Sequence, residues 1–135
     1  MRKIKFRAWD YKWKNMFLVG VMESSEDDFI INEAVGQFYK DGEWDTFILK
    51  SFELMQFTGL KTRDGVEIFE GDIIECRDGK YIIEYVENFA KFVMTRGNSI
   101  QDADTCMRSI KVIGNIYENP ELRDVLVATG EGGGE

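Results

Sequence analysis

Asp-Gly and Gly-Asn pairs divide this 135-residue chain into short segments, and they constrain its fold more than any other feature. The tightest hairpin turns need a positive φ angle at both central residues, which glycine adopts freely and aspartate or asparagine tolerates. The chain has 13 glycines and one proline. The pairs are Asp41-Gly42, Asp64-Gly65, Asp78-Gly79 and Gly97-Asn98. Their spacing is typical of short antiparallel strands joined by hairpins.

β-branched and aromatic residues gather between these turns, as they do in strands. The segments 73–76 and 81–86 flank one of the pairs, and we predict that they form a hairpin turning at Asp78-Gly79. The full set of predicted strands is 4–9, 16–22, 36–39, 44–49, 54–57, 73–76, 81–86, 92–95 and 110–117.

A helical signal is confined to the end of the chain. Asn119 can cap a helix, Pro120 suits its first position, and the carboxylate of Glu121 favours the positive helix N-terminus. Three apolar residues then share one helical face, namely Leu122, Val125 and Leu126. The pattern predicts one short C-terminal helix.

The predicted fold is therefore mainly β, with short antiparallel strands, an SH3-like small barrel element and one short C-terminal helix. We expect a single β-rich domain over 1–127, with a soft internal boundary near 59–65. The barrel-like part would span 66–118. A small closed barrel of this kind leaves no free sheet edges. Residues 128–135 are rich in glycine and glutamate, have nothing to bury, and are predicted to be a disordered tail.

Charge and composition exclude several classes of function. The chain has 25 acidic and 17 basic residues, a net charge of −8, whereas proteins that grip phosphates usually carry the opposite sign. It has no histidine, which excludes Ser-His-Asp and Cys-His nucleophile systems and zinc sites built on HExxH. It has no run of about 18 apolar residues that could span a membrane. We expect a protein that is not an enzyme and needs no cofactor.

The two cysteines and the carboxylates are the residues that bear on a catalytic alternative. Cys76 and Cys106 are too few for a structural zinc site, and we expect both to be reduced thiols in a cytoplasmic protein, because no export signal is present. Carboxylates are abundant, and a cluster of them can hold Mg²⁺ or act as general acid and base. Glu67, Glu70 and Asp72 cluster around a predicted turn, and Asp102 and Asp104 lie in a separate polar loop. A solvated acidic surface is the simpler interpretation of this set.

The basic and aromatic start of the chain is the strongest candidate for a binding surface. In the predicted strand 4–9, Lys5, Arg7 and Trp9 share one face by the two-residue period. We expect these three residues to be exposed, while Ile4 and Phe6 point into the core. An exposed aromatic ring flanked by cations can stack on a base of single-stranded nucleic acid or dock on a protein. Alternatively, the cations only offset the negative charge of the rest of the chain.

Three ordered motifs make the chain resemble a known family. They are residues 4–10 (IKFRAWD), residues 54–74, which include LMQFTGLK and DGVEIFEGDII, and residues 113–122 (IGNIYENPEL). Together they resemble the YopX family of small bacteriophage and prophage proteins. The resemblance implies a mainly β fold with an SH3-like element, a phage or prophage origin and a cytoplasmic location in the bacterial host. It implies no catalytic residue.

These observations favour a non-enzymatic module that binds a host or phage protein and forms a homo-oligomer. The alternatives are a nucleic-acid-binding protein that uses the basic and aromatic N-terminal strand, and a carboxylate-dependent metalloenzyme. An acidic surface that imitates DNA and blocks a host protein is a further hypothesis compatible with the net charge.

Overall fold

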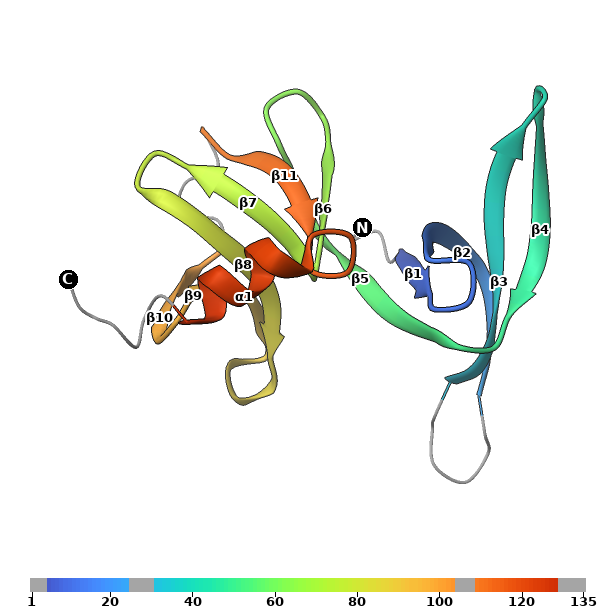
Figure 1. The fold of residues 1–135 in the computed structure, drawn as a ribbon, viewed down its shortest axis with the longest axis horizontal. Helices are drawn as coiled ribbons and strands as arrows, with labels where there is room; N and C mark the ends of the chain where they lie inside the picture. The colour runs from blue at the N-terminus through green and yellow to red at the C-terminus, as the bar shows by residue number, and fades with distance from the viewer. Residues whose placement is uncertain (1–4, 25–30, 104–108, 129–135) are drawn as a thin grey trace. The chain divides into compact units, whose positions relative to one another are not determined.

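The computed structural model describes residues 5–24, 31–103 and 109–128 (Figure 1). The fold of this part is mainly β, with a single short α-helix, as predicted. None of its helices is long and apolar enough to cross a membrane. Along the chain, the elements are β1 Phe6–Asp10, β2 Asn15–Ser24, β3 Ile31–Lys40, β4 Glu43–Leu49, β5 Phe52–Lys61, β6 Glu67–Phe69, β7 Asp72–Cys76, β8 Gly79–Val86, the 3-10 turn η1 Glu87–Phe89, β9 Lys91–Arg96, β10 Ser99–Asp102, β11 Lys111–Asn115 and α1 Pro120–Ala128.

The described residues form two compact units that divide between Gln56 and Phe57, inside strand β5. This division lies just before the soft boundary expected near 59–65. The expectation of a single domain over 1–127 stays a prediction. Ala128, which we expected in the tail, is the last residue of the helix, and 129–135 lie outside the described residues.

The first unit is an antiparallel sheet in which the strands follow the order β4-β3-β2-β1-β5. Strands β3 and β4 pair up to Lys40 and Glu43, so Asp41-Gly42 forms the two-residue turn that the sequence predicted. Both turn residues have positive φ, at 54° and 85°. A small core cluster lies on this sheet, made of Ala8, Phe17 and Leu49 with Val19, Phe52 and Leu54 packed against them.

The second unit contains a five-stranded antiparallel sheet in the order β10-β9-β8-β7-β11, and β6 pairs with the end of β5. The pairings among the described residues leave this sheet open at β10 and β11. The SH3-like barrel element is therefore not confirmed. Strands β6 and β10 were not predicted, because each has only three or four residues and carries little alternation.

The predicted hairpin of β7 and β8 is confirmed, with a small correction. Cys76 pairs with Gly79, so the two turn residues are Arg77 and Asp78, one position earlier than expected. Gly79 has a φ of 143°, and a Cβ atom there would collide with the guanidinium of Arg96. The positive φ favours glycine at this position, whereas the guanidinium is the far end of a flexible side chain that can shift.

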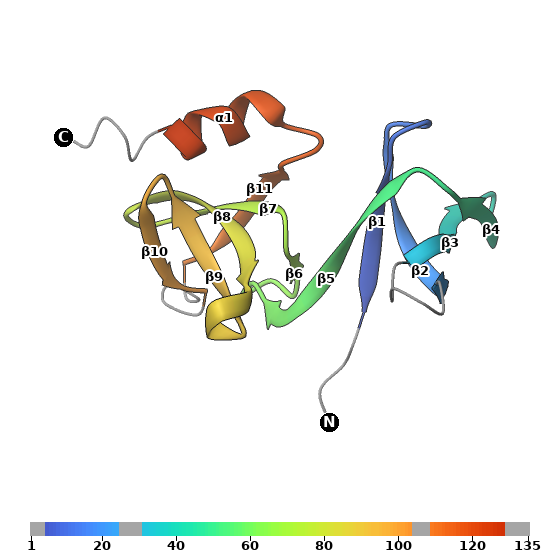
Figure 2. The ribbon, with the colours of Figure 1, turned by 90° about the horizontal axis from the view of Figure 1, so that it is seen from below.

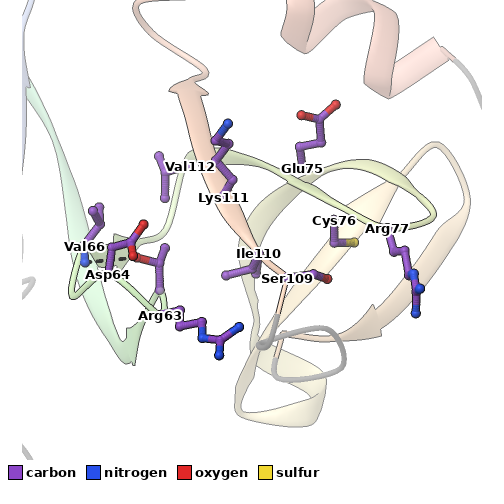
Figure 3. A pocket seen from close by; sticks show the side chains of 11 residues that line it. Arg63, Asp64, Val66, Glu75, Cys76, Arg77, Ser109, Ile110, Lys111 and Val112 are labelled. Carbon is purple, nitrogen blue, oxygen red and sulfur yellow. Dashed lines mark hydrogen bonds between the residues drawn. The ribbon is translucent and has the colours of Figure 1, made fainter.

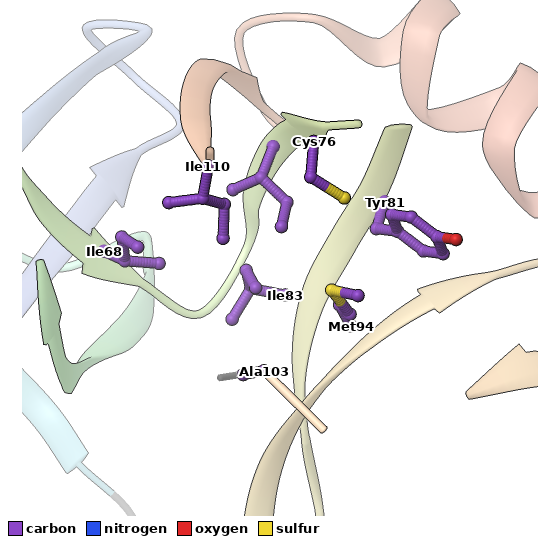
Figure 4. Packing of buried hydrophobic residues seen from close by; sticks show 8 residues of the cluster. Ile68, Cys76, Tyr81, Ile83, Met94, Ala103 and Ile110 are labelled. Atoms are coloured by element: carbon purple, nitrogen blue, oxygen red, sulfur yellow. The ribbon is translucent and has the colours of Figure 1, made fainter. Parts of the chain in front are cut away.

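Both faces of the second sheet are covered. On one face, Ile74, Tyr81 and Ile83 belong to the larger core cluster, together with Ile68, Cys76, Met94, Ala103 and Ile110 (Figure 4). On the other face, Ile73 and Ile82 pack against Leu126 of α1, which lies along the sheet (Figure 2). Alternate residues of β7 and β8 therefore feed two different cores.

The helix begins at Pro120, as predicted, but it is anchored differently from the expected cap. The Asn119 carbonyl accepts the Arg123 N–H at 3.1 Å, which is the first helical hydrogen bond. The Asn119 side-chain oxygen instead accepts the Asn115 N–H at 3.1 Å, and so ties the helix start to the end of β11. The Asn115 side-chain oxygen in turn accepts the N–H groups of Tyr117 and Glu118.

Candidate interaction surfaces

The predicted surface of Lys5, Arg7 and Trp9 is not an exposed face. Trp9 retains only 9% of its accessible surface, and Lys5 and Arg7 are half-buried. Strand β1 lies inside the first sheet, where Trp9 pairs with Met16 on one side and Glu53 on the other. The expected exposure of Trp9 is therefore wrong. Whether these three residues contact a partner stays a prediction.

The exposed aromatic residues of this region lie in the loop between β1 and β2, which we call the β1–β2 tip and which comprises residues 11–14. Trp13 is 64% exposed and Tyr11 is 47% exposed, and Lys12 and Lys14 are exposed beside them. Both aromatics fall in the gap between the predicted strands 4–9 and 16–22. That position was the signal that would have identified the tip.

Hydrogen bonds at both ends hold the β1–β2 tip in shape. The buried Asp10 carboxylate accepts the Trp13 N–H at 2.8 Å, and the Asp10 carbonyl accepts the Lys14 N–H at 2.8 Å. The Tyr11 N–H donates to the Ser51 carbonyl at 3.0 Å. Lys14 closes the loop with a φ of 53°. The tip is thus a preformed turn on a sheet rather than a loose connection.

The β1–β2 tip combines positive charge with aromatic surface. The Lys12 ammonium lies 5.5 Å from the centroid of the Trp13 ring, within range of a cation–π contact. Burial, and secondarily the Glu53 carboxylate with its hydrogen bond, raise the pKa of Tyr11 above its ordinary value. The Tyr11 hydroxyl is therefore neutral at physiological pH, with its hydrogen bond directed to the Glu53 carboxylate.

A second candidate surface lies in the unit of residues 57–128. It is a shallow groove of about 470 Å³, lined by Phe89, Lys91, Val93, Ile100, Gln101 and Asp102. Phe89 and Ile100 are 58% and 54% exposed and line the same groove. The Lys91 ammonium lies 2.5 Å from the Asp102 carboxylate and 5.9 Å from the centre of the Phe89 ring.

A third hollow, of about 670 Å³, lies between the 62–66 turn, the end of β7 and the start of β11 (Figure 3). Arginine and lysine side chains line it together with carboxylates, so its charge is mixed. The lining residues are Thr62, Arg63, Asp64, Val66, Glu75, Cys76, Arg77, Ser109, Ile110, Lys111 and Val112.

The Cys76 thiol is buried and hydrogen-bonded within the β7–β8 hairpin. The thiol donates a hydrogen bond to Asp78 Oδ1 at 3.1 Å. This bond is the main cause that lowers the pKa of Asp78 below its ordinary value, which makes the carboxylate a weak base. A reactive thiolate needs a neighbouring base or a positive environment. Cys106 lies outside the described residues, so the expected second buried thiol is untested.

Asp78 belongs to a polar network that ties the β7–β8 hairpin to β9 and β10. The Tyr81 hydroxyl donates to Asp78 Oδ2 and accepts the Gln101 amide N–H, both at 3.1 Å. Arg96 lies over the Tyr81 ring at 4.8 Å and reaches the Asp78 carbonyl. Tyr81 is 1% exposed, and its burial is the main cause that raises its pKa. The network stabilises the hairpin and needs no ligand.

Two of the carboxylates singled out in the sequence, Asp72 and Asp102, take part in local structure. The buried Asp72 carboxylate accepts the Phe69 N–H at 2.8 Å and closes the turn before β7. Asp102 pairs with Lys91, and Asp104 lies outside the described residues. Within 5–24, 31–103 and 109–128, no three metal-binding side chains gather at one point.

Comparisons with known proteins agree with the motifs. A model of the YopX family, described as YopX protein, matches residues 5–124 and confirms the resemblance. Among solved structures, the chain is similar to the crystal structure of protein EF1440 from Enterococcus faecalis, with 27% sequence identity and a TM-score of 0.64. The similarity covers 90% of this chain and 99% of that chain. None of the curated proteins compared with the chain matches it.

Proposed function

Because this chain belongs to the YopX family, we propose that it is a phage or prophage accessory protein that acts in the bacterial cytoplasm by binding another protein. In this proposal it catalyses no reaction and needs no cofactor. The phage origin follows from the family resemblance. The binding role follows from the surface of the protein, and one observation carries it: Trp13 is 64% exposed on a preformed turn.

An exposed tryptophan offers a large gain to any partner that covers it. A tryptophan side chain buries about 150–250 Å² when it is enclosed, at about 25 cal/mol per Å². With 64% of its surface still open, covering Trp13 would contribute about 2–4 kcal/mol. The hydrogen bonds that the Trp13 and Lys14 N–H groups donate to Asp10 hold the turn, which reduces the ordering cost of binding.

The chemistry of the β1–β2 tip favours a protein partner over nucleic acid. Lys12 and Lys14 supply only two positive charges, while Glu53 lies against Tyr11 and the whole chain carries −8. Nucleic-acid affinity depends on neutralising many phosphates, which this balance opposes. A protein surface with an apolar socket for Trp13 and carboxylates at its rim fits the tip better.

Affinity purification from bacteria that carry the phage or prophage tests the proposal. The wild-type chain, Trp13→Ala and a matched control, Val127→Ala, would be used as baits under the same conditions. Val127 is 58% exposed on α1, far along the chain from the tip. We expect a protein that co-purifies in equal amounts with the wild type and the control, and that is lost from Trp13→Ala.

A second measurement decides between protein and nucleic acid. The wild-type chain would be titrated into fluorescently labelled oligonucleotides at about 150 mM salt, near physiological ionic strength. We expect no saturation below about 10 μM. Specific nucleic-acid binding through salt-sensitive phosphate contacts would saturate below that concentration. Saturation in that range, abolished by changing Lys12 and Lys14 to Ser, would replace a protein partner with nucleic acid.

A further inference from the structure

We infer that strand β10 and the groove beside it form a self-association surface, on which a second copy of this chain adds its own β10 in the antiparallel direction. The contact would bury Phe89 and Ile100 of both copies. This surface lies in the unit of residues 57–128, so it is separate from the β1–β2 tip and independent of the function proposed for that tip.

Strand β10 is an edge strand of its sheet in the part of the chain that the structure describes. Among the described residues it pairs with β9 alone, and it ends the order β10-β9-β8-β7-β11. Its register runs without interruption from the Ser99↔Arg96 pair to the Asp102↔Val93 pair. A regular edge strand presents unpaired backbone N–H and C=O groups, and these can pair with another strand.

The opposite edge strand of the same sheet, β11, is protected against pairing with another chain, unlike β10. The pairing of β11 with β7 shifts register between Val112 and Gly114, and such bulges disfavour edge-to-edge pairing. Gly114 also lies against the Asn119 side chain at the start of the helix segment. Strand β10 carries no such bulge and instead exposes an apolar residue, Ile100.

The apolar side chains near β10 form one continuous surface with it. Phe89 and Ile100, 58% and 54% exposed, line the same groove of about 470 Å³ together with Val93. Phe89 is held there by η1, which Ala90 ends in the left-handed conformation. Covering two such side chains in each copy would add apolar burial to the backbone hydrogen bonds of the paired strands.

Charge favours a second copy as the occupant. In a two-fold contact each group meets the same patch of the other copy, so a charged patch would face its own sign. Two chains of net −8 repel, but in this groove the Lys91 ammonium and the Asp102 carboxylate neutralise each other at 2.5 Å. The groove thus combines exposed apolar side chains with a locally balanced charge in an acidic protein, which suits a self-contact.

Sedimentation equilibrium of the full chain tests this inference. A contact of this small size belongs at the weak end of specific interfaces, so we expect dimers with a dissociation constant of about 10–100 μM. Ile100→Asp would place like charges across the two-fold axis and should raise that constant at least about tenfold. Val127→Asp, on an equally exposed valine, and Trp13→Ala should leave it unchanged.

Two further measurements keep the result decisive. Ile100→Thr, which keeps a β-branched residue in the edge strand, should also weaken the dimer, so the test does not depend on Ile100→Asp folding. Amide hydrogen exchange at 99–102 should slow as protein concentration rises. A wild-type chain that stays monomeric up to about 1 mM, or a dimer that both Ile100 variants leave intact, would overturn the inference.

Discussion

Gly114→Ala tests how the C-terminal helix is anchored to the sheet. A Cβ atom at this position would collide with the side-chain oxygen of Asn119. That oxygen accepts the N–H of Asn115, a residue that is 6% exposed. The variant should therefore displace Asn119 and leave a buried N–H without its partner.

The magnitude follows from two opposing effects. An unsatisfied buried N–H costs about 1–3 kcal/mol. Replacing glycine with alanine, where the backbone permits it, stabilises by about 0.4–1 kcal/mol because the unfolded chain loses freedom. The φ angle of Gly114 is not in the positive region, so this gain applies. The lost hydrogen bond is the larger effect, and the variant should be less stable by about 1–2 kcal/mol.

Urea unfolding followed by far-UV circular dichroism measures this loss. Tryptophan fluorescence is unsuitable, because all three tryptophans precede residue 57 and report on the first unit. The decisive comparison is a double-mutant cycle with Asn119→Ala, which removes the same hydrogen bond and the colliding atom together. In that background Gly114→Ala should be neutral or slightly stabilising. Additive effects, within about 0.5 kcal/mol, would refute the anchoring role of Asn119.

The other predictions concern the two tryptophans of the N-terminal hairpin and the hairpin network of the second unit. Trp9→Ala should lower the free energy of unfolding by about 3–5 kcal/mol, whereas Trp13→Ala should change it by less than about 0.5 kcal/mol, as measured by urea denaturation. Hydrogen bonds lower the pKa of Asp78 below 3.8 in the folded protein. Its stabilising contribution is therefore present above pH 3.8 and is lost as the pH falls through the pKa of the folded state. Asp78→Asn should flatten the acid side of a plot of Tm against pH. Burial raises the pKa of Tyr81 above 10.0 in the folded protein. Its contribution to stability is therefore present below pH 10.0 and is lost as the pH rises through the pKa of the folded state. Tyr81→Phe should flatten the alkaline side of the plot of Tm against pH.

Local chemistry predicted much of the fold. The turn at Asp41-Gly42 and the helix start at Pro120 appear where the sequence placed them, because each depends on the backbone preferences of one or two residues. The β7–β8 turn is shifted by one residue, so Gly79 is the first residue of β8 rather than a turn residue. The Asp-Gly pattern is compatible with both registers, so the sequence does not distinguish them.

The candidate surface was harder to predict. The two-residue period correctly separates the two faces of β1, but it does not say how many faces are covered. Trp9 is buried because β1 is an interior strand, and strand order depends on pairings between distant segments. Trp13 is exposed because it lies in the loop between two predicted strands, so its exposure could have been predicted from strand boundaries alone. The barrel element is not confirmed, and it was hard to predict for a related reason, since closure of a barrel depends on long-range pairing.

Site-specific photo-crosslinking from position 13 tests most directly the claim that this protein binds another protein through the β1–β2 tip. A photoreactive aromatic amino acid, which keeps a large apolar ring at the tip, would replace Trp13 in one chain and Val127 in the control, and both chains would be irradiated in cells that carry the phage or prophage. The account predicts one protein adduct from position 13, absent from position 127, which excess wild-type chain removes and excess Trp13→Ala does not. The same adducts from both positions, or an adduct to nucleic acid, would contradict it.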